Sequence, residues 1–274
     1  MQGRVLVVAG SDSGGGAGIQ ADIKTITALG GYAATAITAL TAQNTLGVFG
    51  IVPVDPDFVA LQMDLVLSDI GADAIKTGML HSPDVIEVVV RVLEKRVASV
   101  PVIVDPVMVA KGGESLLDDA ALFALRRRLI PRAALVTPNA PEAAAIARLP
   151  VETEADMGAA ADAILALGAA AVLIKGAHLP GDEILDLLRT ADGEQLEIRH
   201  SRIDSRSTHG TGCTLASAIA EGVAEGLTLR DSVVRAEGYL RQAILGAPGF
   251  GQGHGPLDHA HPVRHFDGPR SELH

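Results

Sequence analysis

The most informative segment for the fold class lies near the start of the chain and reads Arg4-Val5-Leu6-Val7-Val8-Ala9-Gly10-Ser11-Asp12-Ser13-Gly14-Gly15-Gly16-Ala17-Gly18. Residues 4–9 form an apolar run rich in valine, which is typical of a short buried strand. We expect a helix over about residues 19–29, directly after the glycine-rich loop. A strand, a glycine-rich loop and a helix in this order predict a ligand at the carboxyl end of the strand.

The glycines of this loop include the pattern Gly16-x-Gly18-x-x-Ala21, which is similar to a dinucleotide-binding fingerprint. The next predicted strand, residues 33–39, does not end in the acidic residue that would hold a ribose. We therefore discount a dinucleotide site. A Walker-type phosphate loop is also absent from the sequence.

Strands and helices alternate through most of the chain. The sequence predicts further strands at 33–40, 50–54, 73–76, 100–104, 134–137 and 170–175, and helices at 57–68, 83–95, 118–129 and 156–167. Such alternation, with near-continuous apolar strands, indicates a parallel sheet that is covered by helices on both faces. No linker or change in composition divides the chain, so we expect one domain over residues 1–274.

A second glycine-rich stretch reads Ser207-Thr208-His209-Gly210-Thr211-Gly212-Cys213-Thr214. It follows a polar segment over 196–204 that we expect to be extended, and it precedes an apolar run over 215–226. The glycines on either side of Thr211 let the backbone turn sharply and present bare N–H groups. The helix that follows directs its N-terminal dipole to the same place, and this combination binds anions, above all phosphate. The alternative is an ordinary loop before a packing helix, with Cys213 as a small core residue.

Composition limits the class of protein. Hydrophobic residues make up 48% of the 274 residues and charged residues 20%, so a large core of Ala, Val, Leu and Ile is possible. The net charge of -11 argues against a nucleic-acid partner. One cysteine excludes an internal disulfide. We expect a cytoplasmic protein with neither a signal peptide nor a membrane span.

Polar side chains collect where the predicted strands end. Asp22 follows the first glycine-rich loop, and successive strands are followed by Gln43, Met79, Asp105, Val107, Asn139, Glu142 and Lys175. The carboxyl ends of parallel strands share one crevice. One half of this crevice would recognise a heterocyclic ligand, because the side-chain amide of Gln43 offers both a hydrogen-bond donor and a hydrogen-bond acceptor. The other half would combine an acid, an amide and a cation with the anion-binding helix start. These are the functional groups that phosphoryl transfer with magnesium requires.

Several of these residues have a purely structural alternative. Asn44 can simply make a turn, and the loop at 110–114 can be a turn rather than a lid over the crevice. Asn139 and Glu142 fit a helix-capping pattern. Asp22 can be a solvated residue early in a helix, Met79 can be core, and Lys175 can be an exposed strand end. The His-rich tail from Gly249 is better explained as a surface strap than as a metal site.

Taken together, the motifs resemble the ribokinase-like superfamily and, more closely, the hydroxymethylpyrimidine/phosphomethylpyrimidine kinases of thiamine biosynthesis. The segments that carry this resemblance extend from residue 4 to the tail and are 9–22, Thr38-Ala39-Leu40-Thr41-Ala42-Gln43-Asn44-Thr45, Lys76-Thr77-Gly78-Met79-Leu80, Asp105-Pro106-Val107-Met108, Ala110-Lys111-Gly112-Gly113, Thr137-Pro138-Asn139-Ala140-Pro141-Glu142, His209-Gly210-Thr211-Gly212-Cys213-Thr214 and Gly253-His254-Gly255-Pro256-Leu257.

The resemblance implies a three-layer α/β/α sandwich with a mostly parallel central sheet. It implies ATP and Mg²⁺ as cofactors, a small pyrimidine as substrate, and a homodimer. The implied activity is phosphorylation of 4-amino-5-hydroxymethyl-2-methylpyrimidine and then of its monophosphate to the diphosphate. The chain departs from the family pattern at Ala140, where relatives often have Leu, and at Glu237 and Gly238, near which many have a basic residue.

The resemblance also implies roles for individual residues. Cys213 would take the proton from the substrate hydroxyl, and its place at a helix N-terminus predicts a lowered pKa that favours the thiolate. The backbone of Gly210, Thr211 and Gly212 would hold the transferred phosphoryl group. The remaining implied contacts are Gly10, Asp22, Gln43, Met79 and Val107 with the pyrimidine, Asn139, Lys175 and Thr208 with ATP, and Asp105 and Glu142 with magnesium.

Two alternatives remain open at this point. The first is a vitamin B6 kinase of the same superfamily, because pyridoxine and pyridoxal are also small hydroxymethylated heteroaromatic compounds. The second is a non-catalytic, vitamin-sensing regulator on a kinase scaffold. The presence of Cys213 and of the Asn139 and Glu142 pair argues against a pure sensor.

Overall fold

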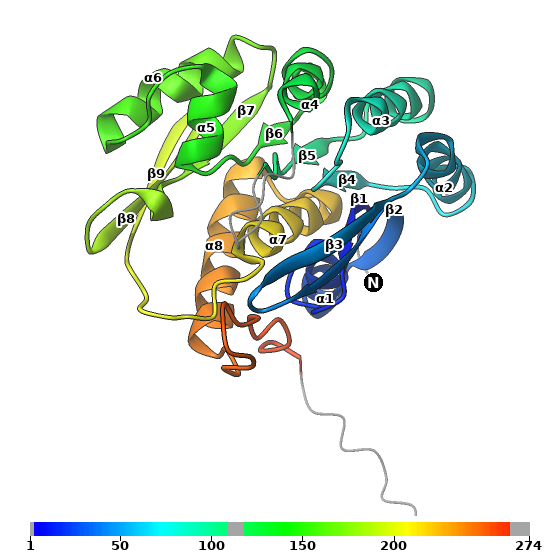
Figure 1. Cartoon of the computed structure of the whole chain (residues 1–274). Helices are drawn as coiled ribbons and strands as arrows, with labels where there is room; N and C mark the ends of the chain where they lie inside the picture. The colour runs from blue at the N-terminus through cyan, green and yellow to red at the C-terminus, as the bar shows by residue number, and fades with distance from the viewer. Residues whose placement is uncertain (1–2, 109–117, 264–274) are drawn as a thin grey trace, which may run out of the picture.

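The fold is a nine-stranded sheet between two layers of helices (Figure 1). The structure is a computed structural model that describes residues 3–108 and 118–263, so the predicted lid at 110–113 lies outside the described residues. The strands are β1 (Arg4–Asp12), β2 (Tyr32–Asn44), β3 (Gly47–Pro53), β4 (Ala74–Thr77), β5 (Val102–Val104), β6 (Leu135–Val136), β7 (Ala171–Lys175), β8 (Glu183–Thr190) and β9 (Gln195–Ser201). Their order across the sheet is β3-β2-β1-β4-β5-β6-β7-β8-β9.

The central part of the sheet is parallel and its two sides are antiparallel. Strands β2, β1, β4, β5, β6 and β7 pair in parallel, whereas β3 and β8 pair antiparallel to their neighbours. The helices are α1 (Gly18–Ala28), α2 (Pro56–Asp69), α3 (Pro83–Arg96), α4 (Asp119–Ala124), α5 (Ala140–Ala147), α6 (Glu154–Leu165), α7 (Thr211–Glu225) and α8 (Leu229–Leu245). The mostly parallel three-layer sandwich expected from the sequence is confirmed.

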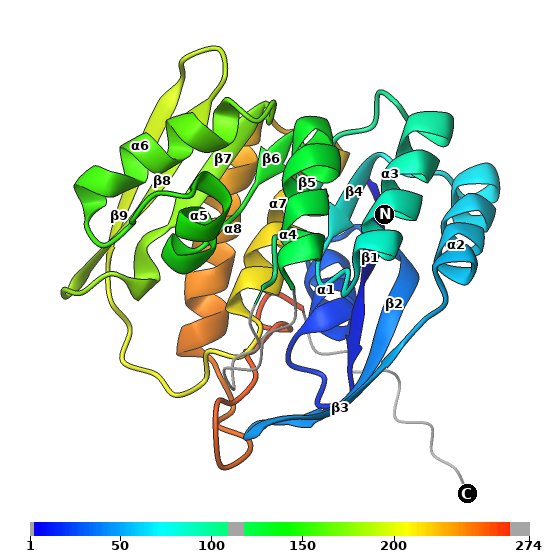
Figure 2. The same ribbon diagram turned by 45° about the horizontal axis from the view of Figure 1, so that its top comes forward.

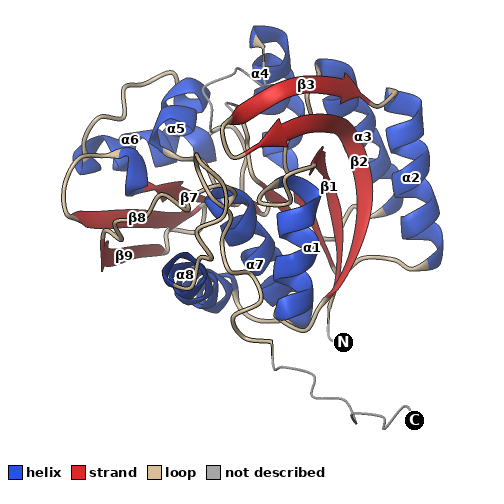
Figure 3. Ribbon diagram, turned by 60° about the horizontal axis from the view of Figure 1, so that its bottom comes forward, coloured by secondary structure: helices blue, strands red, loops and turns tan. Residues whose placement is uncertain are grey.

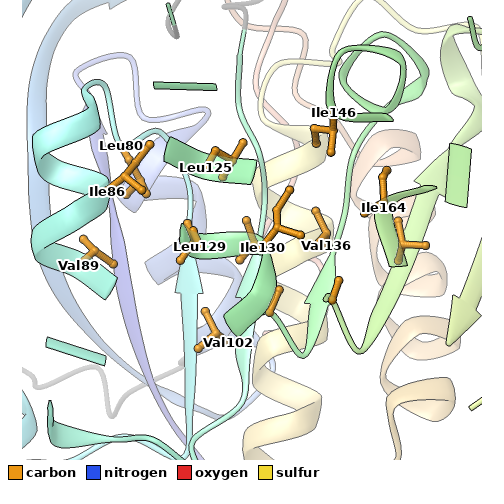
Figure 4. Packing of buried hydrophobic residues seen from close by; sticks show 14 of the residues in the cluster. Leu80, Ile86, Val89, Val102, Leu125, Leu129, Ile130, Val136, Ile146 and Ile164 are labelled. Carbon is orange, nitrogen blue, oxygen red and sulfur yellow. The ribbon is translucent and has the colours of Figure 1, made fainter. Parts of the chain in front are cut away.

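Each face of the sheet has its own apolar core. One core joins the sheet to α2 through α6 and includes Ile86, Leu129 and Ile164, which Figure 4 shows packed between helices and strands. The other core lies beneath α1, α7 and α8 and includes Ile26 and Ile219. Figure 2 shows α2 to α6 in front of the sheet and α7 and α8 behind it. Every central strand is therefore buried on both faces, which explains its uniformly apolar sequence.

Most helices begin at a side-chain cap. Asp55 accepts hydrogen bonds from the first turn of α2, and Ser82 does the same for α3. In α5, Asn139 and Glu142 form a reciprocal capping box. Such caps satisfy the N–H groups that the first turn leaves unpaired. By contrast, α7 begins at Thr211 with no side-chain cap from any described residue, so its first N–H groups remain available.

The structure extends or corrects several sequence-based expectations. Strand β2 runs through Gln43 and Asn44, which were expected at a strand-to-loop transition, because the antiparallel pairing with β3 prolongs it. Asn44 also makes the expected turn, since its Oδ1 accepts a hydrogen bond from the Leu46 amide at 2.8 Å. Strand β8 and helix α8 were not predicted as elements, whereas α5 begins at the helix-capping pattern of Asn139 and Glu142.

The helix expected over 118–129 is only partly α-helical. Helix α4 ends at Ala124 and passes into a π-helical turn (Leu125–Leu129) and a 3-10 turn (Ile130–Arg132). Pro131 has no N–H group and cannot continue an α-helical ladder, which accounts for the change.

The segment after α8 crosses the surface as a strap. The amide of His254 donates to the Thr45 carbonyl, and residue 209 forms an isolated β-bridge with Pro256. The Tyr239 hydroxyl holds the carbonyl of His259 at 2.7 Å. Figure 3 shows this segment on the side of α1, α7 and α8. The surface strap expected from the sequence is confirmed for its described part. No helix in the described part of the chain has the length and apolar character needed to cross a membrane.

Candidate active site

A cleft of about 860 Å³ opens at the carboxyl ends of the parallel strands. It is lined by all but one of the residues that the sequence assigned to a site, namely Gly10, Gln43, Met79, Asp105, Val107, Asn139, Glu142, Lys175, Thr208, Gly210, Thr211, Gly212 and Cys213. The exception is Asp22. Thus the sheet brings together residues that lie up to two hundred positions apart in sequence, as expected for strand ends in an α/β fold.

The anion-binding loop depends on the conformation of Gly210. This residue has φ +83, and a Cβ atom there would lie 1.9 Å from the carbonyl oxygen of Gly16. Only glycine fits this backbone-to-backbone contact between the two glycine-rich loops. The N–H groups at the start of α7 consequently face the cleft without a side-chain cap from the described residues. This is the geometry that binds phosphate at a helix N-terminus.

Asp105 and Lys175 lie opposite this helix start. A Cβ atom built on Gly212 would be 3.2 Å from Lys175 Nζ and 3.7 Å from Asp105 Oδ2. The Lys175 ammonium is 3.4 Å from Asp105 Oδ1. Burial alone would lower the pKa of Lys175, but the nearby carboxylates of Asp105 and Glu142 raise it. A fixed positive charge and unpaired N–H groups therefore meet at one point, where a transferred phosphoryl group can be stabilised.

Asp105 and Glu142 fit a magnesium ion. Asp105 is buried, and its Oδ2 atom has no hydrogen-bond partner among residues 3–108 and 118–263. Burial raises the pKa of Glu142 to about 7, an effect that Lys175 opposes and Asp105 strengthens. Two buried carboxylates near each other are a ligand set of the kind that Mg²⁺ takes together with waters and phosphate. Glu142 also caps α5, so the structural alternative for this residue holds alongside the functional one.

The other side of the cleft combines apolar side chains with the amide of Gln43. Met79 contacts Gly10 so closely that a Cβ atom on the glycine would lie 2.5 Å from the methionine Cε. Met79 and Ala39 form a small apolar cluster with Ile51 and Val107. A flat, methyl-bearing ring fits such a surface.

Gln43 is oriented by Asp12, a residue that the sequence analysis did not single out. The Gln43 side-chain amide lies near the Asp12 carboxylate and helps to lower the pKa of Asp12. Because an ionised carboxylate only accepts hydrogen bonds, the NH₂ group of Gln43 is the end that faces it. The carbonyl oxygen of Gln43 is thereby left to accept a hydrogen bond from a ligand in the cleft, such as an exocyclic amino group.

Asp12 also ties the two glycine-rich loops together. Its carboxylate accepts hydrogen bonds from the Gly14, Gly16 and Ala17 amides and from His209 Nε2 at 2.8 Å. Burial alone would raise the pKa of Asp12, but the hydrogen bond from His209 is the first of several that lower it to about 2. A clue was present in the sequence, since an acid inside a glycine-rich loop is well placed to accept backbone N–H groups.

Asp22 is not at the surface of the cleft. This position corrects the expectation that Asp22 contacts the pyrimidine, and it also rules out the alternative that Asp22 is a solvated residue early in a helix. Its carboxylate is fully buried and holds Lys76 Nζ at 2.9 and 3.0 Å. The Ser217 hydroxyl donates to the same carboxylate at 2.7 Å. Burial alone would lower the pKa of Lys76, but Asp22 raises it. The pair ties β4 to α1 and α7 beneath the cleft.

The expectation of a lowered thiol pKa at Cys213 is wrong. Burial raises the pKa of Cys213 to about 12, although the nearby Lys76 ammonium opposes this rise. The effect of the helix dipole on the pKa of Cys213 is short-ranged, and the loss of water around the sulfur outweighs it. The side chain nevertheless lines the cleft beside the anion-binding loop, as expected.

Three further cleft residues were not assigned to the site from the sequence, two of them because β8 and α8 were not predicted. They are Asp186 on β8, His200 on β9 and Glu237 on α8. Burial and the neighbouring charge of Asp186 raise the pKa of Glu237 well above its usual range. The family pattern suggested a basic residue near this position, so this part of the cleft has a carboxyl group where relatives often have a cation.

The sheet order and the cleft at the strand ends define the ribokinase-like class of α/β proteins. The sequence pattern described as phosphomethylpyrimidine kinase matches residues 12–258. The chain therefore belongs to the phosphomethylpyrimidine kinase family.

Individual relatives support this assignment. The chain is 45% identical over 258 residues to the hydroxymethylpyrimidine/phosphomethylpyrimidine kinase of Bacillus subtilis, covering 93% of this chain and 94% of the relative. It is 51% identical over 260 residues to the thiamine biosynthesis bifunctional protein ThiED of Geobacter sulfurreducens, covering 94% of this chain but only 52% of that longer protein.

Solved structures resemble the fold closely. The ADP complex of Bacillus subtilis pyridoxal kinase has a TM-score of 0.89 at 34% identity and covers 96% of this chain and 100% of that one. A phosphomethylpyrimidine kinase from Clostridium difficile has a TM-score of 0.78 at 39% identity and covers 88% of this chain and 99% of that one.

Proposed function

We propose that this protein is an ATP-dependent kinase that phosphorylates 4-amino-5-hydroxymethyl-2-methylpyrimidine and then converts its monophosphate to the diphosphate. The observation that carries the proposal is the position of the uncapped start of α7, which faces Lys175 and Asp105 between an apolar half and a polar half of one cleft. Membership of the phosphomethylpyrimidine kinase family supports the same activity.

In this proposal the pyrimidine occupies the half of the cleft formed by Met79, Val107 and Gln43. The carbonyl oxygen of Gln43 accepts a hydrogen bond from the exocyclic amine, because Asp12 already holds its NH₂ group. The ring packs on the Met79 side chain and the Gly10 backbone. The hydroxymethyl group then points toward Cys213 and the start of α7, where the acceptor oxygen and the phosphoryl group meet.

The other half of the cleft holds the nucleotide in this proposal. Lys175, Asn139 and Thr208 contact ATP, while Asp105 and Glu142 hold Mg²⁺, which neutralises phosphate charge when it is bound. The N–H groups of Gly210, Thr211 and Gly212 donate to the oxygens on which charge develops. The thiolate form of Cys213 would accept the hydroxyl proton at Sγ while the hydroxyl oxygen bonds to the γ-phosphorus and ADP leaves. Its raised pKa makes the thiolate scarce before substrate binds, so we assign part of the rate to orientation of the hydroxyl group.

A second substrate class has support from the structural comparisons. The chain resembles pyridoxal kinases with TM-scores up to 0.89, and one such kinase from Staphylococcus aureus was solved in complex with pyridoxal. Vitamin B6 alcohols are therefore the alternative substrates. The test is ADP formation with Mg·ATP and each alcohol separately, followed by mass spectrometry of the product. Turnover of pyridoxal without any phosphorylated pyrimidine would overturn the main proposal, and no turnover of either alcohol would favour a sensor.

We further propose that the chain acts as one domain and forms a cytoplasmic homodimer through β2, β3 and α2. Leu40 and Val52 are cross-strand partners, and their side chains are 50% and 63% exposed. Phe49 on the edge strand β3 is 72% exposed. Exposed apolar edge strands are usually covered by a partner. Light scattering should give twice the chain mass for the parent protein and the single-chain mass for Phe49→Asp; a monomeric parent would overturn this proposal.

A further inference from the structure

The nucleotide half of the cleft contains a cluster of three metal-ligating side chains that the proposed reaction does not use. Asp186, His200 and Glu237 each offer one ligand atom, and these atoms all lie within 4.8 Å of one another. Asp186 is 4% exposed and Glu237 is 5% exposed. All three line the cleft, so an ion bound here is accessible from solvent.

The sheet register places two of these side chains on one face. In the β8–β9 pair, Ile184 is opposite His200 and Asp186 is opposite Ile198. Directly opposed residues share a face, and so do residues two apart on one strand. Asp186 and His200 therefore project from the same face of the sheet. Glu237 comes to them from α8, which lies behind the sheet in Figure 2.

Two polar atoms of the cluster have no partner. Glu237 Oε1 and His200 Nδ1 are buried and accept or donate no hydrogen bond within the part of the chain that the structure describes. A buried polar atom without a partner costs about 1–3 kcal/mol, so such atoms are rare unless a ligand satisfies them. Asp186 is in turn anchored by the Gly176 amide, which donates to its Oδ1 at 2.7 Å. Such a hydrogen bond orients a carboxylate for metal binding.

We propose that Asp186, His200 and Glu237 bind one divalent transition-metal ion, separate from the magnesium that serves ATP. Two carboxylate oxygens and one imidazole nitrogen form a mixed ligand set that suits Zn²⁺ or Co²⁺ better than Mg²⁺. In a tetrahedral zinc site the ligand atoms are about 3 to 4 Å apart, so small side-chain rotations close the cluster around the ion. Three protein ligands leave a position open toward the cleft. The 2+ charge compensates the two buried carboxylates.

The test is titration of the purified, metal-free protein with Zn²⁺ alone, measured by isothermal calorimetry in the absence of nucleotide. We expect the parent to bind Zn²⁺ at this cluster and expect Glu237→Gln and His200→Gln each to weaken that event at least about tenfold. Glu237→Gln keeps the size and shape of the side chain and should fold. The half-buried His200 provides a second, independent variant.

Matched controls separate this cluster from other cation sites. Glu142→Gln alters the magnesium site, and His261→Gln alters the histidines of the C-terminal strap; both should retain the Zn²⁺ event. Co²⁺ should give visible absorption bands that His200→Gln loses. The proposal is overturned if Zn²⁺ affinity is unchanged in both cluster variants, or if the event disappears in either control. Because no nucleotide or alcohol is present, these outcomes do not depend on the proposed kinase activity.

Discussion

Replacing Lys76 by Met tests whether Asp22 is a structural residue or a substrate contact. Lys76 and Asp22 are each fully buried, and the ammonium contacts both carboxylate oxygens. Removing one partner of a buried ion pair costs about 3–5 kcal/mol, because the remaining charge is left without compensation. With an m-value of about 3 kcal/mol/M, the urea midpoint of Lys76→Met should fall by about 1 to 1.7 M.

The double variant Asp22→Asn/Lys76→Met should recover much of this loss. It buries no charge, and the amide oxygen introduced at position 22 would still accept the hydrogen bond from Ser217. The matched control is Glu87→Gln, which breaks an exposed ion pair with Arg128 and should cost less than about 1 kcal/mol. Equilibrium urea unfolding followed by circular dichroism measures all four proteins.

Two results would refute the structural assignment of Asp22. One is a Lys76→Met midpoint within the range of the Glu87→Gln control. The other is an Asp22→Asn enzyme that keeps its urea midpoint but has a raised KM for the pyrimidine, because a substrate contact would affect binding and leave folding unchanged.

Three further predictions concern the site. Cys213→Ala should retain both KM values within about threefold and lose on the order of a hundredfold or more of kcat; rapid-quench turnover within a few-fold of the parent would instead assign catalysis to the backbone of Gly210 to Gly212. Gln43→Ala should weaken pyrimidine binding by about ten- to a hundred-fold and ATP binding far less, because an unpaired polar contact costs about 1–3 kcal/mol; equal losses in calorimetry with each ligand would make Gln43 structural. Asp12→Asn should lower the free energy of unfolding by about 2 kcal/mol at pH 7, because folding lowers the pKa of Asp12 from its ordinary value of 3.8 to about 2. A carboxyl group whose pKa is lower in the folded protein stabilises the fold at pH values above its unfolded pKa, and this stabilisation is lost as the pH falls through its folded pKa. About half of the difference in unfolding free energy between the parent and Asp12→Asn should therefore disappear by pH 3. A difference in urea midpoint that stays the same between pH 7 and pH 3 would contradict this prediction.

The regular part of the fold was predictable from local sequence because its signals are local. Strand β1 and helix α3 follow from a valine-rich run and from the Ser82-Pro83 start signal. Strand β8 escaped prediction because Glu183, Asp186 and Arg189 interrupt its apolar residues at spacings typical of neither a clean strand nor a helix. Its conformation is fixed by antiparallel pairing with β7 and β9, which is a contact between distant segments.

The residues that gather at the strand ends could be predicted from the strand pattern, because the carboxyl ends of parallel strands must share one edge. The sequence also indicated the anion-binding loop, since two glycines before a helix leave backbone N–H groups free. The protonation behaviour of individual side chains, in contrast, became clear only in the folded arrangement. Burial raises the pKa of Cys213 to about 12, against the expectation from its helix position, and it places Asp22 out of reach of the cleft beside Lys76. Solvation depends on what surrounds a side chain in space, and neither spacing nor residue type records how much water packing removes.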